Sequence, residues 1–125
     1  MSKKILLVED ELTLRELYEE VLKEGGYDVE HASDGDEAVE KMFKGNWDLL
    51  VLDIMLPKLD GLEILKKLKS TENVSKKPVI VFSNLDGKDI IQQCMDLGAV
   101  SYLVKSNIDP SHFVEEVDKY ISDGK

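Results

Sequence analysis

Five short apolar runs alternate along this 125-residue chain with five segments whose apolar residues recur at helical spacing. The runs cover residues 4–8, 49–52, 78–82 and 100–104, together with residues 27–32, where apolar and polar residues alternate as in a half-exposed edge strand. Alternation of this kind predicts an α/β fold, a doubly wound parallel sheet with helices on both faces. Because parallel strands run the same way, their carboxyl ends all meet at one edge of the sheet.

The third run is the most apolar and stops at an acid. Leu49 to Leu52 are four apolar residues in succession, typical of a strand covered on both faces. Asp53 follows, and Pro57 and Gly61 then indicate a loop. Open α/β sheets place their ligand sites at the carboxyl ends of strands, although a lone polar residue there could simply end the strand.

Polar side chains also follow three of the other runs. Glu9 and Asp10 end the first, Ser83 the fourth and Lys105 the fifth. One polar terminus could arise by chance, whereas four strands that bring acids, a hydroxyl and an ammonium to one edge favour a site.

Three carboxylates held together must be neutralised, because each pair at ~4 Å costs about 4 kcal/mol at an effective dielectric constant near 20. Oxygen ligands favour a hard cation, and Mg²⁺ is the first candidate. An Mg²⁺ ion bound in this way leaves coordination positions open for a phosphoryl group. Lys105 and Ser83 could then stabilise phosphoryl oxygens, with Asp53 as the nucleophile that forms an acyl phosphate. Neither a GxxxxGK[ST] loop nor a GxGxxG motif is present, so a nucleotide site has no support.

Several other residues are expected to be structural. The first helical segment shows an apolar stripe, and the third carries lysines that should face solvent. We expect Trp47 to pack at a strand entrance, His31 to point outward, Leu12 to be exposed and Cys94 to lie in the core. The stripe consists of Leu14, Leu17, Tyr18, Val21 and Leu22.

The composition restricts the partners and the compartment. With 16 basic and 26 acidic residues the formal charge is −10, and residues 9–40 alone carry 13 acids against two bases. Such a chain is not expected to bind nucleic acid directly, since phosphate contacts need a basic face. No run is long enough to span a membrane, the start leaves no room for a signal peptide, and the single cysteine suits a reducing compartment. We therefore expect a cytoplasmic protein whose partners are proteins.

Taken together, these motifs make the chain resemble the receiver domain of two-component response regulators. The resemblance covers nearly all of residues 1–125, which we treat as one domain, and implies the strand order 2-1-3-4-5 with five helices. It rests on Leu7-Val8-Glu9-Asp10-Glu11, Leu52-Asp53-Ile54-Met55-Leu56-Pro57 with Asp60-Gly61, Ser83, Gly98-Ala99, and Tyr102 with Lys105.

The resemblance implies a metal site around a phosphoacceptor. Asp53 would accept the phosphoryl group and contact the Mg²⁺ ion. Asp10 would be a direct ligand, Glu9 an outer ligand through water, and the backbone carbonyl of Met55 a third protein ligand.

The resemblance also implies a switch. Ser83 and Lys105 would hold the phosphoryl oxygens, and Tyr102 would follow Ser83, although on the residues alone it could be a half-buried strand aromatic. Ser106 stands where the family often has proline after the lysine, so we expect a trans peptide at Lys105–Ser106. Because Met55 and Leu85 would flank the site and cannot orient a water, we expect slow self-dephosphorylation.

The implied function is a phosphorylation-controlled switch, not a conventional enzyme. The chain would take phosphate from a sensor histidine kinase or a phosphotransfer protein, catalyse its own phosphorylation and dephosphorylation, and present a changed protein-binding face to an unidentified downstream protein. Two alternatives remain at this point. One is a haloacid-dehalogenase-like aspartyl-phosphate hydrolase, which would need an acid where Met55 stands. The other is a degenerate, unphosphorylated interaction module.

Overall fold

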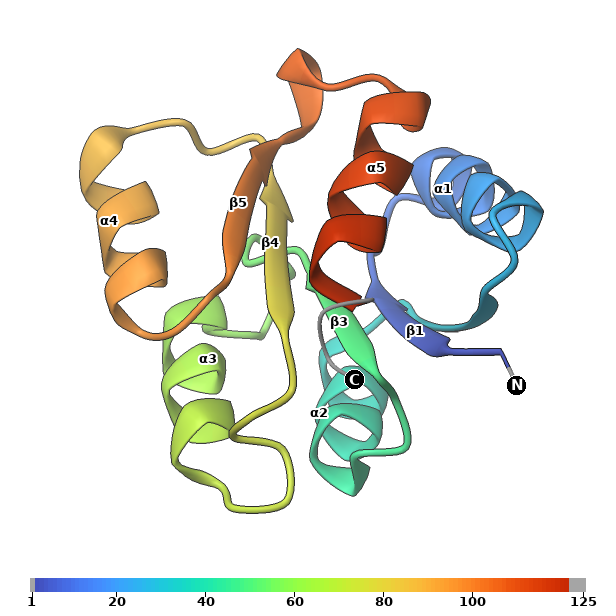
Figure 1. Ribbon diagram of the computed structural model, residues 1–125. Helices are drawn as coiled ribbons and strands as arrows, with labels where there is room; N and C mark the ends of the chain where they lie inside the picture. Colours follow the sequence, from blue (N-terminus) through green and yellow to red (C-terminus); the bar gives the residue numbers. More distant parts are fainter. Residues whose placement is uncertain (1, 122–125) are drawn as a thin grey trace.

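The computed structural model describes residues 2–121, which form one five-stranded parallel sheet in the order β2-β1-β3-β4-β5 (Figure 1). This confirms both the predicted fold class and the predicted strand order. The strands are β1 (Lys4–Val8), β2 (Asp28–Ala32), β3 (Leu49–Leu52), β4 (Val79–Ser83) and β5 (Ser101–Val104).

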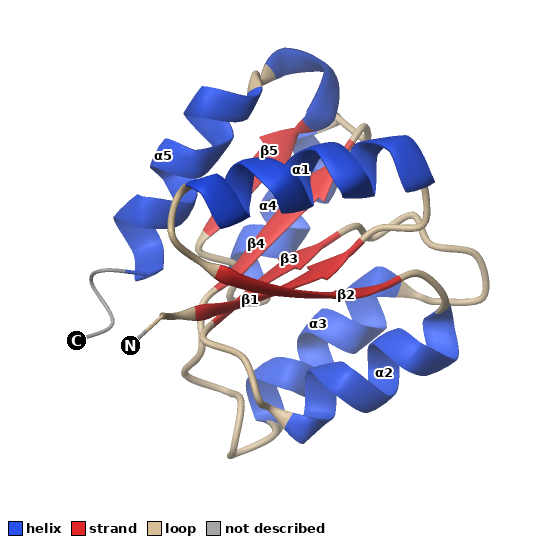
Figure 2. Ribbon diagram, turned by 90° about the vertical axis from the view of Figure 1, so that its right-hand side faces the viewer, coloured by secondary structure: helices blue, strands red, loops and turns tan. Residues whose placement is uncertain are grey.

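Helices cover both faces of the sheet, two on one side and three on the other (Figure 2). α1 and α5 pack over the core that contains Tyr18, Phe82 and Phe113, whereas α2, α3 and α4 pack over the core that contains Met42 and Leu65. The helices are α1 (Leu12–Glu24), α2 (Gly35–Lys44), α3 (Gly61–Ser70), α4 (Lys88–Asp96) and α5 (Pro110–Ile121), with a 3₁₀ turn at Lys105–Asn107.

The central strand is buried on both faces, as its uninterrupted apolar run predicts. All four residues of β3 are fully buried, and the strand pairs with β1 on one side and β4 on the other. β2, at the edge, is only half buried. Asp53 therefore follows the middle strand of the sheet.

Two helices beside the carboxyl edge begin in the same way. The Asp34 side chain accepts a hydrogen bond from the backbone of Glu37 at the start of α2, and Asp60 does the same with Glu63 at the start of α3. Both helices have glycine at their first position. A Cβ on Gly61 would lie 2.5 Å from Cβ of Ile54, so only glycine lets α3 approach the β3–α3 loop this closely.

The predicted stripe of α1 is wrong at one position. Tyr18 and Leu22 are buried, but Leu17 is 42% exposed. Leu17 and Tyr18 are consecutive residues that point in different directions from the helix axis, and α5 and the sheet cover only the side on which Tyr18 lies. Leu12 is 55% exposed, as expected.

Lys69 also differs from expectation, because it does not simply face solvent. Its Nζ donates to the backbone carbonyls of Lys77, at 3.0 Å, and of Ser75, at 3.4 Å. Its stem occupies the space beside Gly98, whose φ of +109° requires glycine. Burial lowers the pKa of Lys69. The lysine thereby ties the end of α3 to the following loop.

The remaining structural expectations are confirmed. Trp47 is buried and its indole N–H donates to the carbonyl of Met42. Cys94 is fully buried in the core under α4. His31 points outward, with Nδ1 3.1 Å from a carboxylate oxygen of Glu19. No helix within residues 2–121 has the length and apolar character needed to cross a bilayer.

Candidate functional site

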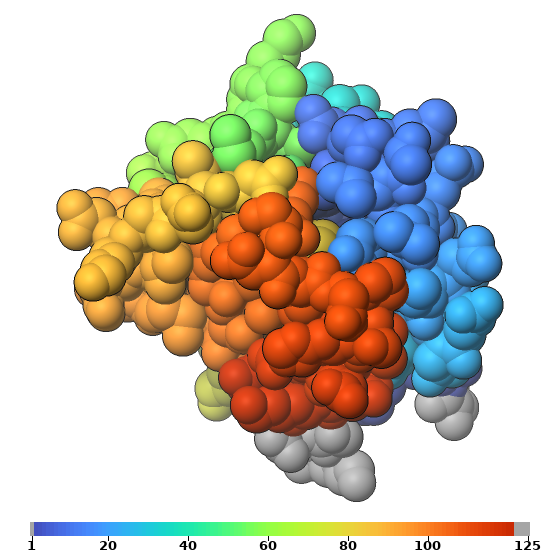
Figure 3. All heavy atoms as spheres, turned by 90° about the horizontal axis from the view of Figure 1, so that it is seen from above, coloured from blue at the N-terminus to red at the C-terminus, as the bar shows by residue number. Residues whose placement is uncertain are grey.

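The polar strand ends meet at one edge of the sheet. The loops that follow β1, β3, β4 and β5 come together on this side of the molecule, which Figure 3 shows from above in blue, green, yellow and orange. Glu9 and Asp10 follow β1, Asp53 follows β3, Ser83 ends β4, and Lys105 follows β5. The structure therefore brings together every residue that the sequence placed at this edge.

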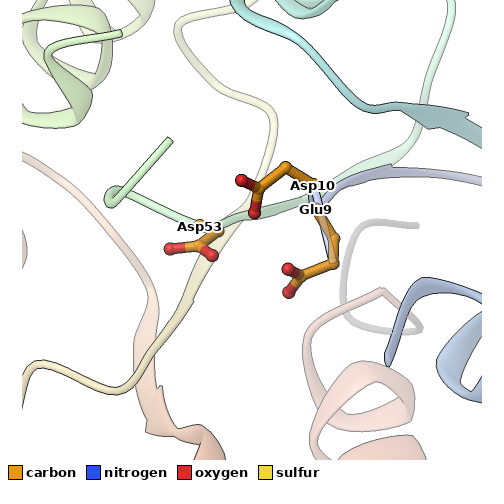
Figure 4. A group of neighbouring side chains, drawn as sticks. All are labelled: Glu9, Asp10 and Asp53. Carbon is orange, nitrogen blue, oxygen red and sulfur yellow. The ribbon is translucent and has the colours of Figure 1, made fainter. Parts of the chain in front are cut away.

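Three carboxylates form the centre of the cluster. Glu9, Asp10 and Asp53 each offer an oxygen within 4.8 Å of the others, and the side chains surround a common space (Figure 4). Glu9 and Asp53 are buried, whereas Asp10 is exposed. This oxygen set has the chemistry that Mg²⁺ requires.

Asp53 is held by contacts to both of its carboxylate oxygens. Oδ1 accepts a hydrogen bond of 2.9 Å from the backbone N–H of Met55, and Oδ2 accepts one of 2.7 Å from Nζ of Lys105. The backbone N–H of Asp53 donates to the carbonyl of Val8, which continues the pairing of β3 with β1. The carboxylate is thus fixed in orientation before any ligand arrives.

Lys105 also pairs with Glu9, since its Nζ lies 2.5 Å from Oε1 of that residue. Burial lowers the pKa of the lysine, but its bonds to Asp53 and Glu9 outweigh burial and the pKa is raised, so the ammonium stays charged. For Glu9 the balance is the reverse. Burial raises its pKa, nearby Asp53 adds to this, and the pull of Lys105 does not compensate. One ammonium therefore does not neutralise the three carboxylates.

The peptide bond after Lys105 is trans, as expected because serine and not proline follows this lysine. Lys105, Ser106 and Asn107 form a 3₁₀ turn, and residues 2–121 contain no cis peptide bond. This confirms the predicted trans bond at Lys105–Ser106. The Lys105 ammonium also lies 5.6 Å from the centre of the Phe82 ring, a favourable cation–π position.

Ser83 and Tyr102 are joined through Leu85. The fully buried Ser83 accepts a hydrogen bond on Oγ from the backbone N–H of Leu85, at 3.2 Å. The hydroxyl of Tyr102 donates to the carbonyl of the same Leu85, at 2.6 Å. The Tyr102 ring is partly buried against the core, and burial raises the pKa of its hydroxyl. One residue of the β4–α4 loop thus links the site hydroxyl to β5.

Two supporting residues were not anticipated from the sequence. The backbone N–H of Glu11 donates to Oε2 of Glu9, while the Glu11 side chain caps α1. Arg15 contacts the carbonyl of Glu9 at 3.5 Å. Arg15 is one of only two bases among residues 9–40, which is the single sequence signal that could have singled it out.

Comparison with known proteins agrees with this geometry. The family profile of the response regulator receiver domain matches residues 5–118. Sporulation initiation phosphotransferase F of Bacillus subtilis is 35% identical over 97% of this chain and 95% of its own length. The alkaline phosphatase synthesis transcriptional regulatory protein PhoP of the same organism is 41% identical over 84% of this chain and 43% of its own length.

Solved structures match as well. The receiver domain of a sensor histidine kinase from Pseudomonas aeruginosa, solved with a magnesium ion in its active-site cleft, has a TM-score of 0.85 and 26% identity, covering 98% of this chain and 99% of that one. The chain spans only 15–44% of the length of the first three curated relatives.

These findings favour a receiver domain over a haloacid-dehalogenase-like hydrolase. A haloacid-dehalogenase-like hydrolase would need an acid at the position of Met55, and the matching profile is that of a different family. The strand order, the acidic cluster, the lysine at the end of β5 and the profile match all lead to the same conclusion. This chain belongs to the response regulator receiver domain family.

Proposed function

We propose that this chain accepts a phosphoryl group on Asp53 from the phosphohistidine of a sensor histidine kinase or a phosphotransfer protein, in a reaction that depends on Mg²⁺. The observation that carries the proposal is the hydrogen bond from Lys105 to Asp53 beside two further carboxylates. In this arrangement the proposed nucleophile lies beside an ammonium and two further carboxylates, which supports the proposal. Family membership supports the same function.

The donor set fits Mg²⁺, because the oxygens of Glu9, Asp10 and Asp53 are the hard ligands that this ion prefers. Three carboxylates share the single Lys105 ammonium at this edge, and a divalent cation would supply further positive charge. By analogy with the family, Asp10 would be the direct ligand, Glu9 would act through water, and the Met55 carbonyl would complete the protein ligands. When bound, Mg²⁺ would offset the charge of the phosphoryl oxygens.

In the transfer step, a carboxylate oxygen of Asp53 attacks phosphorus in line with the phosphorus–nitrogen bond of the donor. That bond breaks, its electron pair stays on the imidazole nitrogen, which takes up a proton from water, and a phosphorus–oxygen bond to Asp53 forms. Lys105 and the Ser83 hydroxyl then stabilise the phosphoryl oxygens. Asp53 therefore ends as a mixed anhydride, and the chain itself is the phosphorylated product rather than a catalyst that turns over a separate substrate.

Phosphorylation would change a protein-binding face through Leu85. When the Ser83 hydroxyl turns to a phosphoryl oxygen, the Leu85 N–H loses its acceptor. The bond from Tyr102 to the Leu85 carbonyl transmits that change to β5. We propose that a downstream protein reads the altered surface, with no direct role for nucleic acid or a membrane, and that the chain acts in the cytoplasm.

The test uses acetyl phosphate as a small-molecule donor. We expect intact-mass measurement to show the addition of one phosphoryl group in the presence of Mg²⁺, and no addition after chelation. Asp53→Asn should abolish the addition, whereas Asp86→Asn, a change to an exposed aspartate after β4, should leave it intact. Equal labelling of Asp53→Asn and the wild type would overturn the assignment of Asp53, whereas no labelling of the wild type would favour the unphosphorylated interaction module.

A further inference from the structure

Three Asp-Gly pairs lie within the described residues, at Asp34-Gly35, Asp60-Gly61 and Asp86-Gly87. Aspartate followed by glycine is prone to isomerise without an enzyme, because glycine has no side chain to hinder attack by its backbone nitrogen on the neighbouring carboxyl group. All three aspartates are exposed, so access to water does not distinguish them. The hydrogen bonds around each pair do distinguish them.

Two of the pairs are held by the helix that follows them. The Asp34 side chain accepts a hydrogen bond from the backbone of Glu37, and its carbonyl accepts one from the backbone of Ala38. Asp60 makes the same two bonds at the start of α3. For the glycine nitrogen to reach the carboxyl carbon, the aspartate must rotate both its side chain and its own Cα–C bond. Isomerisation at these two pairs therefore requires both hydrogen bonds to break.

The third pair lacks both restraints. Asp86 lies in the β4–α4 loop (Figure 1), and among residues 2–121 no group donates a hydrogen bond to its carboxylate or its carbonyl. The first backbone bond of α4 runs instead from Ile91 to the carbonyl of Gly87, at 3.1 Å, one residue beyond the bond that must rotate. Asp86 can therefore reach the reactive geometry while the first turn of α4 stays intact.

We propose that Asp86 is a site of spontaneous isoaspartate formation, and that this modification separates Leu85 from Tyr102. The Gly87 nitrogen attacks the protonated carboxyl group of Asp86, its proton leaves with the carboxyl hydroxyl as water, and a five-membered succinimide ring forms. Water then attacks the ring at the former backbone carbonyl and breaks its bond to nitrogen. The chain now runs through the side-chain carbonyl. One water is lost and one is gained, so no other reactant is needed and the mass does not change.

The modification alters the backbone directly after Leu85. The N–H of Leu85 donates to Oγ of Ser83, and its carbonyl accepts from the Tyr102 hydroxyl, at 2.6 Å. Isoaspartate adds one carbon to the backbone of a short loop that β4 and α4 fix at its ends, and it moves the carboxylate one bond closer to the Leu85 carbonyl. Isomerised molecules therefore lose the link between β4 and β5.

Ageing of the whole chain at mildly acidic pH tests the proposal, because the carboxyl group reacts in its protonated form. Samples are digested with trypsin, which leaves each Asp-Gly pair in a separate peptide. Chromatography separates the isomeric peptides, and electron-transfer fragmentation distinguishes isoaspartate from aspartate. The pair Asp123-Gly124, outside the described residues, is followed in its own peptide and does not interfere.

We expect isoaspartate to accumulate at Asp86 about 30-fold faster than at Asp34 or Asp60, because two hydrogen bonds of ordinary strength correspond to about 2 kcal/mol. In urea the three pairs should react at similar rates, since the helices that hold two of them are lost.

Two variants serve as controls for the chemistry. Gly87→Ala should slow the reaction at Asp86 several-fold by hindering the attacking nitrogen. The substitution fits the fold, because φ of Gly87 is −66° and the added Cβ would have Cγ2 of Ile90 as its nearest neighbour, at 3.9 Å. Asp86→Glu keeps the negative charge but would need a six-membered ring, so it should abolish the product.

Equal rates at the three pairs of the folded protein would overturn the choice of Asp86, as would a faster reaction at Asp34 or Asp60. The structural consequence has its own measurement. Isomerised protein, purified from aged material by ion-exchange chromatography, should show faster hydrogen exchange at the Leu85 amide than fresh protein. Unchanged exchange at this amide would refute the loss of the link to Tyr102.

Discussion

Lys105 donates a hydrogen bond of 2.7 Å to Asp53 across 52 residues of sequence. The same ammonium pairs with Glu9, so in this state one lysine is shared by two of the three carboxylates. A divalent cation that binds at this edge must share these oxygens with Lys105. The lysine thus stabilises the acid cluster before phosphorylation, in addition to its proposed role on the phosphoryl oxygens.

Replacing Lys105 with methionine should destabilise the protein. Removing one partner of a buried ion pair typically costs roughly 3–5 kcal/mol, and the open edge of this site should place the loss at the lower end. Urea unfolding at neutral pH measures the change, and added Mg²⁺ should restore part of the loss. Lys88→Met, at an exposed lysine of α4, is the control. Equal midpoints for the two variants would contradict this role of Lys105.

Glu9→Gln should stabilise the Mg²⁺-free protein in a pH-dependent way. The pKa of Glu9 is raised in the folded state, mainly by burial, so the folded protein favours the protonated form. Below the unfolded-state value of 4.5 the substitution should have little effect, and its benefit should grow as pH rises through the folded pKa. Every tenfold difference in proton affinity between the folded and unfolded states corresponds to about 1.4 kcal/mol. Thermal unfolding between pH 4 and pH 8 provides the test, and a benefit that shrinks as pH rises would refute it.

The two acids after β1 should contribute unequally to Mg²⁺ binding. Asp10→Asn should weaken the affinity strongly, because Asp10 is the proposed direct ligand, whereas Glu9→Gln should weaken it less. Titration calorimetry is the suitable measurement. Trp47 fluorescence is less suitable, because Trp47 precedes β3 and lies at the opposite edge of the sheet from Asp53. Comparable losses in both variants would mean that the ranking of the ligands is wrong.

Gly61→Ala should destabilise the protein by roughly 1–3 kcal/mol, the usual cost of overpacking. The added Cβ would lie 2.6 Å from the backbone Cα of Ile54, and backbone cannot simply move aside. Gly35→Ala is a matched control, because Gly35 also begins a helix after a capping aspartate and its nearest neighbours are 3.7 Å away. That control should be neutral or stabilising by up to about 1 kcal/mol. Similar losses at both glycines would rule out the Ile54 contact as the cause.

Tyr102→Phe should loosen the β4–α4 loop. The substitution removes the hydrogen bond to the Leu85 carbonyl, which is worth about 1 kcal/mol. Hydrogen exchange of the backbone amides at residues 84–87 should become faster. Tyr120→Phe removes a hydroxyl from a ring that packs near Lys119 and should leave these amides unchanged. Unaltered exchange in Tyr102→Phe would show that the loop does not depend on this bond.

The sequence predicted those parts of the site that depend on strand ends. Asp53 and Lys105 could be brought together because each follows a recognisable apolar run, and parallel strands share an edge. The sequence could not show that Lys105 also pairs with Glu9, since that depends on how far the lysine reaches after the 3₁₀ turn. The link from Ser83 through Leu85 to Tyr102 rests on the path of a loop, which apolar spacing does not encode.

The errors in the fold have a similar origin. Leu17 fits the helical spacing of α1 but lies beyond the edge of the surface that the sheet and α5 cover. Lys69 was expected to face solvent, but its Nζ donates to the carbonyls of Ser75 and Lys77 in the loop after α3. Both depend on contacts between elements, whereas periodicity describes each element separately.

The burial of Cys94 gives the chain a built-in reporter. Its thiol is the only one in the sequence, it is fully buried under α4, and burial raises its pKa, so it resists alkylation in the folded state. A thiol reagent therefore reacts only when α4 lifts from the sheet, and the rate of reaction measures the free energy of that opening. Comparing that rate before and after phosphorylation would read out motion of α4 without any mutation.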